Sequence, residues 1–255
     1  MTTIDVTTAW AYGMTLATLR TGAFVVGGGL IPKSLPKVVR GTPALAFAAV
    51  ICRPVVGNPD VSTLVVAAFT NSVIGFILGW LLGLAVHPFQ VAGTLLDIST
   101  GLTVGALFDK ESGTTPGPIA RICTMAGMTL IIVLGGLGIS AKVLAASVDA
   151  VALDGSLHSV PGMGPIATRA VTGMIRSGIQ LALPITAVLF IAEVAFGLLS
   201  RTAPQINSFL VGLPLKLMSM FFLFGGLVVV FPGVADRALA DGVANVRSAL
   251  SLLGS

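Results

Sequence analysis

The chain has 255 residues, of which 55% are hydrophobic and 9% are charged, and its formal net charge is +4. Soluble domains carry roughly 25% charged residues, and the mean hydropathy of this chain is +1.01. The composition excludes an ordinary soluble domain and predicts an all-α integral membrane protein, a single multi-helix domain over residues 1–255 with about six hydrophobic helical segments. No basic run is interleaved with aromatic residues, so we expect contacts with the membrane surface and with protein partners, not with nucleic acid.

The first apolar segment, residues 10–30, is long enough to cross a bilayer, since about 20 residues span about 30 Å of hydrocarbon. Residues 1–9 contain no Lys or Arg, so we expect no cleaved signal peptide here. Arg20 stands near the middle of the segment, where an Arg costs roughly 2.5–3.5 kcal/mol on insertion scales. We therefore expect Arg20 to face a protein partner or a wet cavity. A basic connection over 31–41 leads to a shorter apolar segment over 42–56, which is predicted to be a partial or interfacial span.

Residues 61–96 contain no Asp, Glu, Lys or Arg. As one helix they would extend about 54 Å, which exceeds a bilayer core, so the segment must bend. His87-Pro88 is the expected corner. Gly75, Gly79 and Gly83 repeat every four residues and form one glycine stripe, which lets two backbones approach closely. The pattern does not distinguish packing within the chain from packing against another subunit.

The second half of the chain alternates apolar spans with polar connections. Residues 89–108 carry Asp97 on an apolar background and lead into a turn-rich polar connection over 108–118. We expect an uncharged span over 122–141, and then a polar connection over 142–178 with an amphipathic helix before a break at Pro161-Gly162. The last predicted elements are a span over 179–199, a span over 217–234 and a weakly amphipathic tail over 236–255.

Two acidic residues, Asp97 and Glu193, lie inside these apolar segments. Buried acids in a membrane are costly and are functional candidates by default. In a transporter they would be proton or substrate sites. In an assembly subunit they would form salt bridges with Arg20, Arg53 or Arg201 across a helix interface, and the residues alone leave both alternatives open.

The sequence contains no motif of an enzyme, a cofactor site or a metal site. The nucleotide-binding pattern G-x-x-x-x-G-K-[ST] and the G-x-S-x-G elbow are absent. His87 and His158 are not at helical metal spacing with Cys, Asp or Glu. Cys52 and Cys123 are isolated, so we expect two reduced, buried thiols. We therefore predict a protein without enzymatic activity or cofactor.

The stretch RTAPQINSFLVGLPLK, residues 201–216, connects the last two predicted spans and has a cation at each end with no charge between them. Thr202 is expected to cap a helix that has Pro204 in its first turn, and Gly212 and Pro214 are expected to loosen or end that helix before Lys216. Amides next to a membrane need partners, so packing against other helices is the expected role. We define the assembly motif as Arg201, Pro204, Gln205, Asn207, Phe209, Gly212, Pro214 and Lys216.

The pattern R-x-x-P-Q-x-N-x-F-x-x-G-x-P-x-K at the mouth of a span resembles the C-terminal signature of the FliR family. Members of that family are export-gate subunits of the flagellar type III secretion apparatus, and their injectisome relatives are called SctT. The resemblance covers most of the chain, and a second group of residues also carries it: Gln90, Gly93, Asp97, Gly101, Gly105, Phe108, Asp109 and Gly113.

The resemblance implies a flagellar biosynthetic protein, a structural and gating subunit of the channel that passes unfolded flagellar proteins. It implies assembly with FliP-like and FliQ-like gate subunits and an FlhB-like export protein, in the bacterial inner membrane at the flagellar basal body. It also implies that the connection 106–119 plugs the closed pore, with candidate plug residues Phe108, Asp109, Lys110, Glu111 and Gly113. The alternatives are an injectisome export gate and a proton-coupled small-molecule permease that uses Asp97 and Glu193.

Overall fold

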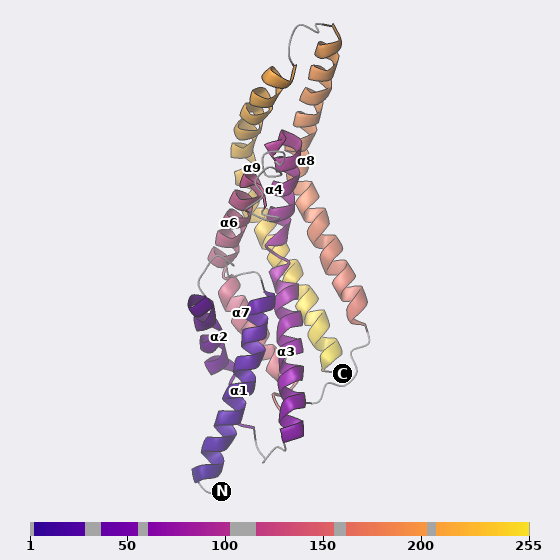
Figure 1. Cartoon of the computed structure of the whole chain (residues 1–255). Helices are drawn as coiled ribbons and strands as arrows, with labels where there is room; N and C mark the ends of the chain where they lie inside the picture. Colours follow the sequence, from indigo (N-terminus) through magenta and orange to yellow (C-terminus); the bar gives the residue numbers. More distant parts are fainter. Residues whose placement is uncertain are drawn as a thin grey trace. The chain divides into compact units, whose positions relative to one another are not determined.

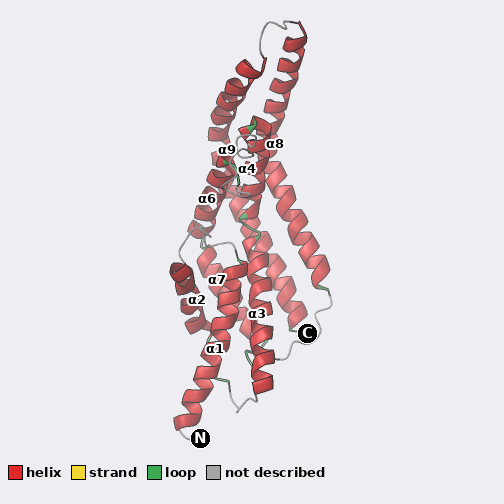
Figure 2. Ribbon diagram, in the orientation of Figure 1, coloured by secondary structure: helices red, strands yellow, loops and turns green. Residues whose placement is uncertain are grey.

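The structure, a computed structural model, describes residues 3–28, 37–55, 61–102, 116–155, 162–202 and 208–254. Within these ranges the chain is helical and has no strand (Figures 1 and 2), which confirms the predicted all-α class. The helices are α1 (Thr3–Gly27), α2 (Lys37–Ile51), α3 (Val61–Gly83), α4 (His87–Thr100), α6 (Pro118–Val133), α7 (Gly136–Ala150), α8 (Met163–Thr202) and α9 (Ser208–Leu253).

Fewer of the described helices can span a membrane than the six segments predicted. Three are long and apolar enough, over Val61–Gly83, Met163–Arg201 and Gly212–Leu253. α6 and α7 pass the same test only together, as one broken span. The lower number has a physical cause: α2, with 15 residues, and α4, with 14, are too short to cross a bilayer, and the predicted span over 122–141 is broken between α6 and α7.

Several predicted boundaries lie inside helices. Most of the predicted polar connection 142–178 is helical, because α7 extends to Ala150 and α8 begins at Met163. The predicted tail 236–255 continues α9 to Leu253. Pro214 and Pro232 lie within α9 and do not end it, so the expected stop near Gly212 and Pro214 is wrong. Thr202 is likewise the last residue of α8 and not the cap of a following helix.

Two other predicted breaks concern proline and glycine. The charge-free segment is interrupted close to the predicted corner at His87-Pro88, since α3 ends at Gly83 and α4 begins at His87 with Pro88 in its first turn. The uncharged segment 122–141 is broken at Gly135, which has a φ of 86°. A left-handed residue ends an α-helix, and glycine adopts that conformation without a steric penalty.

The chain divides into two compact units. Unit 1 consists of Met1–Ala85, Ile132–Val171 and Leu239–Ser255. Its core is formed by α1, α3 and α7 together with the first turns of α8 and the last turns of α9, and α2 packs against α1 and α7 (Figure 1). Fully buried side chains such as Leu16, Ile74 and Leu144 fill this core. The backbone N–H of Val55 donates to the carbonyl of Ala9 at 3.2 Å and so holds the chain after α2 along α1.

Unit 2 consists of Val86–Ile131 and Thr172–Ala238. It contains α4, α6 and the greater part of α8 and α9. Its centre is aromatic: the rings of Phe89 and Phe231 meet edge to face with centroids 5.2 Å apart, and Phe224 packs on Phe231 in the same way at 6.1 Å. Such pairs stabilise a core by about 0.5–1.5 kcal/mol beyond the burial of their area.

Candidate functional site

The glycine stripe lies in the contact between α3 and α1. A Cβ added to Gly75 would meet the backbone carbonyl of Arg20, and one added to Gly79 would meet that of Phe24. A Cβ on Gly83 would lie 2.8 Å from the carbonyl carbon of Gly28. The two backbones are therefore in direct contact along one face, and a side chain at any of the three positions would push the helices apart. In this structure the partner of the stripe belongs to the same chain.

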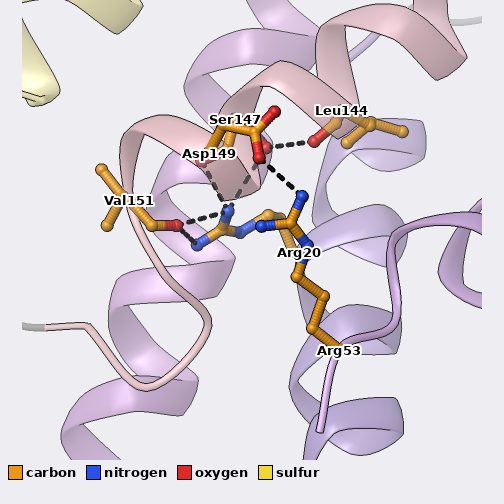
Figure 3. Close-up of polar contacts among 6 residues, drawn as sticks. All are labelled: Arg20, Arg53, Leu144, Ser147, Asp149 and Val151. Carbon is orange, nitrogen blue, oxygen red and sulfur yellow. Dashed lines mark hydrogen bonds and ion pairs between the residues drawn. The ribbon is translucent and has the colours of Figure 1, made fainter. Parts of the chain in front are cut away.

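Arg20 is the first of two buried charges, with no exposed surface at all. Its guanidinium donates five hydrogen bonds to groups on α3 and at the end of α7, and Figure 3 shows those to Ser147 and Val151. Nε donates to Oδ1 of Asn71 at 2.7 Å, and Nη1 donates to the carbonyl of Ser147 at 3.0 Å. Nη1 and Nη2 both donate to the carbonyl of Val151 at 3.0 Å. The charge thus joins α1, α3 and α7 at one point.

The C-terminus of α7 compensates the charge of Arg20. Val151 is the C-cap of α7, so the carbonyls of Ser147 and Val151 belong to the negative end of the helix dipole, which is equivalent to about half an elementary charge. Among the described residues no carboxylate contacts the guanidinium. The sequence therefore predicted correctly that Arg20 would face protein, but the partner is a helix end instead of an acid.

Asn71 completes this cluster. While its Oδ1 accepts from Arg20, its Nδ2 donates to the carbonyls of Ala67 at 2.7 Å and Leu153 at 2.8 Å. Asn71 was not among the predicted site residues, although it lies four residues before Gly75, in register with the glycine stripe. A signal was available in the sequence: Asn71 is an amide side chain on an apolar helix, on the same face as the glycine stripe that packs against another helix.

Asp97 is the second buried charge, and it lies at the N-terminus of α6. Its Oδ1 accepts from the backbone N–H of Ile119 at 3.1 Å, and its Oδ2 accepts from that of Ala120 at 2.9 Å. These N–H groups have no partner inside the helix, and they carry the positive end of its dipole. A Cβ on Gly117 would meet the carboxylate, so glycine at that position allows the close approach. Asp97 thus fixes the point at which α6 begins.

The predicted salt bridges between the acids and the arginines do not form in the described part of the chain. Asp97 binds backbone N–H groups, while Arg53 pairs with Asp149 at 2.6 Å in an exposed position. The physical reason is that each buried charge lies at a helix end of opposite partial charge. A helix end supplies the compensation that a counter-ion would otherwise provide.

The structure also corrects the prediction that Glu193 is buried. Its side chain is 64% exposed, and its Oε1 forms an ion pair with Nζ of Lys216 at 3.0 Å. Glu193 lies on a face of α8 that the core of unit 2 does not cover, and α9 brings the last residue of the assembly motif beside it. Lys216 is the partner, and Arg201 is not.

The remaining predicted residues are only partly described. Arg201 is exposed near the end of α8, Gly212 is buried and Pro214 is exposed on α9. Phe209 lies on α9 in a part where only the backbone is described. The other predicted residues fall outside the described residues: Pro204, Gln205, Asn207, Phe108, Asp109, Lys110, Glu111 and Gly113. In the described ranges, no group of three or more His, Cys, Asp or Glu side chains could hold a metal ion.

Comparisons with known proteins identify the family. The model of the family described as bacterial export proteins, family 1, matches residues 11–242. The flagellar biosynthetic protein FliR of Bacillus subtilis is 26% identical over 224 residues, which are 82% of this chain and 83% of the relative. FliR of Pectobacterium carotovorum is 28% identical over 189 residues, 70% of this chain and 69% of the relative. The surface presentation of antigens protein SpaR of Salmonella typhimurium is 29% identical over 146 residues, 57% of this chain and 54% of the relative. Because the family model matches most of its length, the chain belongs to family 1 of the bacterial export proteins, the FliR family.

Proposed function

We propose that this chain is a structural and gating subunit of the flagellar type III protein export channel. In this role it assembles with FliP-like and FliQ-like gate subunits and an FlhB-like export protein in the bacterial inner membrane, at the flagellar basal body. It passes unfolded flagellar proteins and performs no enzymatic step. The observation that carries the proposal is the family match over residues 11–242 together with the similarity to FliR over most of both chains.

The surfaces of α8 and α9 support an assembly role. The most apolar stretch of α8 is only 22% buried and that of α9 only 17%, although each stretch has a mean hydropathy of 2.2. Large apolar side chains are exposed along them, among them Phe190, Ile191, Phe222 and Val229. Contiguous exposed apolar surface of this kind marks contact with protein or membrane. Unit 2 therefore has a surface that is complete only when neighbouring subunits or lipid cover it.

We assign the assembly motif to this surface and the plug to the segment before α6. The motif links α8 to α9, and its Lys216 is already paired across the two helices. The plug assignment, residues 108–113, rests on the family resemblance alone. Asp97 holds the chain shortly after that segment, at Ile119 and Ala120, so a displaced plug would return to a fixed starting point.

Co-purification with the gate subunits tests the proposal. The chain, carrying a tag, would be expressed with the FliP-like and FliQ-like proteins of the same genome and extracted from membranes with mild detergent. We expect a complex that contains all three proteins, and restored motility in a strain that lacks its own FliR. A chain that inserts into the membrane at a normal level but recovers neither subunit would contradict the proposal.

The similarity to SpaR favours one second candidate, an injectisome export gate. It covers 54% of SpaR but 83% of Bacillus subtilis FliR, so the flagellar role has the wider support. Complementation separates the two candidates. Rescue of motility in a strain without FliR indicates the flagellar gate, whereas rescue of injectisome secretion alone indicates the second role.

A further inference from the structure

We propose that a groove along α8 in unit 2 binds an apolar helix of another membrane subunit that carries one Lys or Arg, and that Glu193 receives this cation. The inference rests on the proposed assembly role and names the chemistry of one partner contact. Its evidence is the shape of the surface around Glu193, the distribution of acceptors in it and the setting of the Glu193–Lys216 pair.

Two hollows meet at Glu193. The first has a volume of about 440 Å³ and lies between the end of α4 and the facing parts of α8 and α9, with Phe196, Gly197, Gly212 and Leu213 in its wall. The second, of about 350 Å³, continues along α8 and is lined by Leu183, Leu189 and Phe190. Ser99 and Glu193 line both hollows, so the two form one groove with a carboxylate at its middle. Apolar side chains and glycines form most of the wall on either side of that charge, as a partner helix from a membrane requires, and the other polar residues of the wall are Thr100 and Lys216 in the first hollow and Thr186 in the second.

The polar groups of the groove are mostly acceptors. Lys216 contacts only Oε1 of Glu193, and Oε2 has no hydrogen-bond or ion-pair partner among the described residues. The hydroxyl of Ser99 donates to the carbonyl of Leu95, so its oxygen keeps lone pairs that can accept from a partner. α4 ends at Thr100, and its C-terminus adds the negative end of a helix dipole. A cationic donor complements this arrangement, and an anion does not.

Exposure of a carboxylate is unfavourable on this face. Glu193 is 64% exposed, whereas Lys216 is only 17% exposed, so the negative partner carries most of the unsatisfied charge. The most apolar stretch of α8 has a mean hydropathy of 2.2. Ionised side chains inside membrane segments normally face protein or a water-filled cavity. A second cation from a neighbouring subunit would satisfy Oε2 and would be desolvated in the apolar groove, where charge pairs are stronger than in water.

Asp149 offers a matched control. Its side chain is 63% exposed and pairs with Arg53, so it resembles Glu193 in exposure and pairing. It lies in unit 1 and lines neither hollow. Glu193→Gln and Asp149→Asn each remove one charge at nearly constant volume. If Glu193 receives a partner cation, only the first substitution weakens assembly.

The experiment measures the complex recovered with the FliP-like and FliQ-like subunits, normalised to the amount of this chain in the membrane. We expect Glu193→Gln to weaken partner binding about ten-fold or more, because it removes one side of a charge pair that the partner would bury. Asp149→Asn should match the wild-type chain. The double variant Glu193→Gln with Lys216→Met removes the pair within the chain as well. It should remain weak, and full recovery of the complex in this variant would overturn the proposal.

Charge reversal identifies the partner residue. A photo-crosslinking phenylalanine analogue at Phe190 should capture a segment of another gate subunit that contains Lys or Arg. Glu193→Lys should abolish that crosslink, and reversal of the captured cation to Glu should restore it. Three results would overturn the groove assignment. The crosslink could capture a second copy of this chain, it could capture a segment without Lys or Arg, or the charge reversal could fail to restore it. If the wild-type chain recovers no gate subunit at all, the proposed function fails instead.

Discussion

Removal of Arg20 should destabilise unit 1 by an amount that its contacts allow us to estimate. In Arg20→Met, Oδ1 of Asn71 and the carbonyl of Val151 lose their donors, while the carbonyl of Ser147 keeps the backbone N–H of Val151 at 3.0 Å. Two buried acceptors without donors cost about 1–3 kcal/mol each. Part of this cost is offset because a buried guanidinium no longer has to be desolvated. The expected net loss is about 2–4 kcal/mol in the free energy of unfolding.

The assay is thermal unfolding of the purified chain in detergent, followed by the loss of monodisperse protein. For a chain of this size, 2–4 kcal/mol lowers Tm by about 4–16 °C. Arg53→Met is the matched control, because Arg53 forms an exposed ion pair with Asp149, and such pairs contribute about 0–1 kcal/mol. An Arg20→Met protein with a Tm as high as that of Arg53→Met would refute the assignment of Arg20 as the junction of α1, α3 and α7.

Four further outcomes are expected. Gly79→Leu should abolish recovery of the gate complex, because no side chain fits between Gly79 and the backbone of α1. A side chain at Gly226 would have open space, so Gly226→Leu should leave the fold intact, as measured by an unchanged size-exclusion profile. Asp97→Asn should lower Tm in the same thermal assay by about 2–12 °C, because it loses the charge and one acceptor at α6, a cost of about 1–3 kcal/mol. An unchanged Tm would mean that the carboxylate contributes no net stability. Asn207→Leu in the assembly motif should reduce co-purification with the gate subunits without reducing membrane insertion, and normal recovery with normal motility would exclude that residue from the interface. Deletion of 111–115 should leave the complex intact but raise membrane conductance to ions in cells that express it with its partners; an intact permeability barrier would mean that this segment is not the plug.

The sequence predicted what local chemistry determines. The start of α4 agrees with the position of Pro88, because a proline is tolerated in the first turn of a helix, where its missing N–H has no partner inside the helix. The glycine repeat correctly marked a face of close helix packing, because a period of four residues places all three positions on one side of a helix. The all-α membrane class followed from composition and from the length of the apolar runs.

The sequence could not predict which groups compensate the buried charges. Charged side chains are visible in a sequence, whereas the ends of helices become charged partners only after the fold is formed. The sequence offered an arginine as one possible partner of Asp97, whereas Asp97 binds the start of α6. Arg20 was expected to face a protein partner or a wet cavity, and it binds the end of α7. Helix ends were also misplaced where a proline stands inside a long helix, as Pro214 does in α9.

The contacts of Arg20 have a consequence for the synthesis of the chain. Asn71 follows Arg20 by 51 residues, and Ser147 follows it by 127. At translation rates of roughly 5–20 residues per second, the carbonyls at the end of α7 leave the ribosome about 6–25 s after Arg20. During that interval the partners of Arg20 on α7 have not yet been made. Asp97, in contrast, is separated from its partner Ile119 by only 22 residues. The full set of hydrogen bonds to Arg20 therefore forms only after α7 has been made, so the junction of α1, α3 and α7 is completed late in biogenesis.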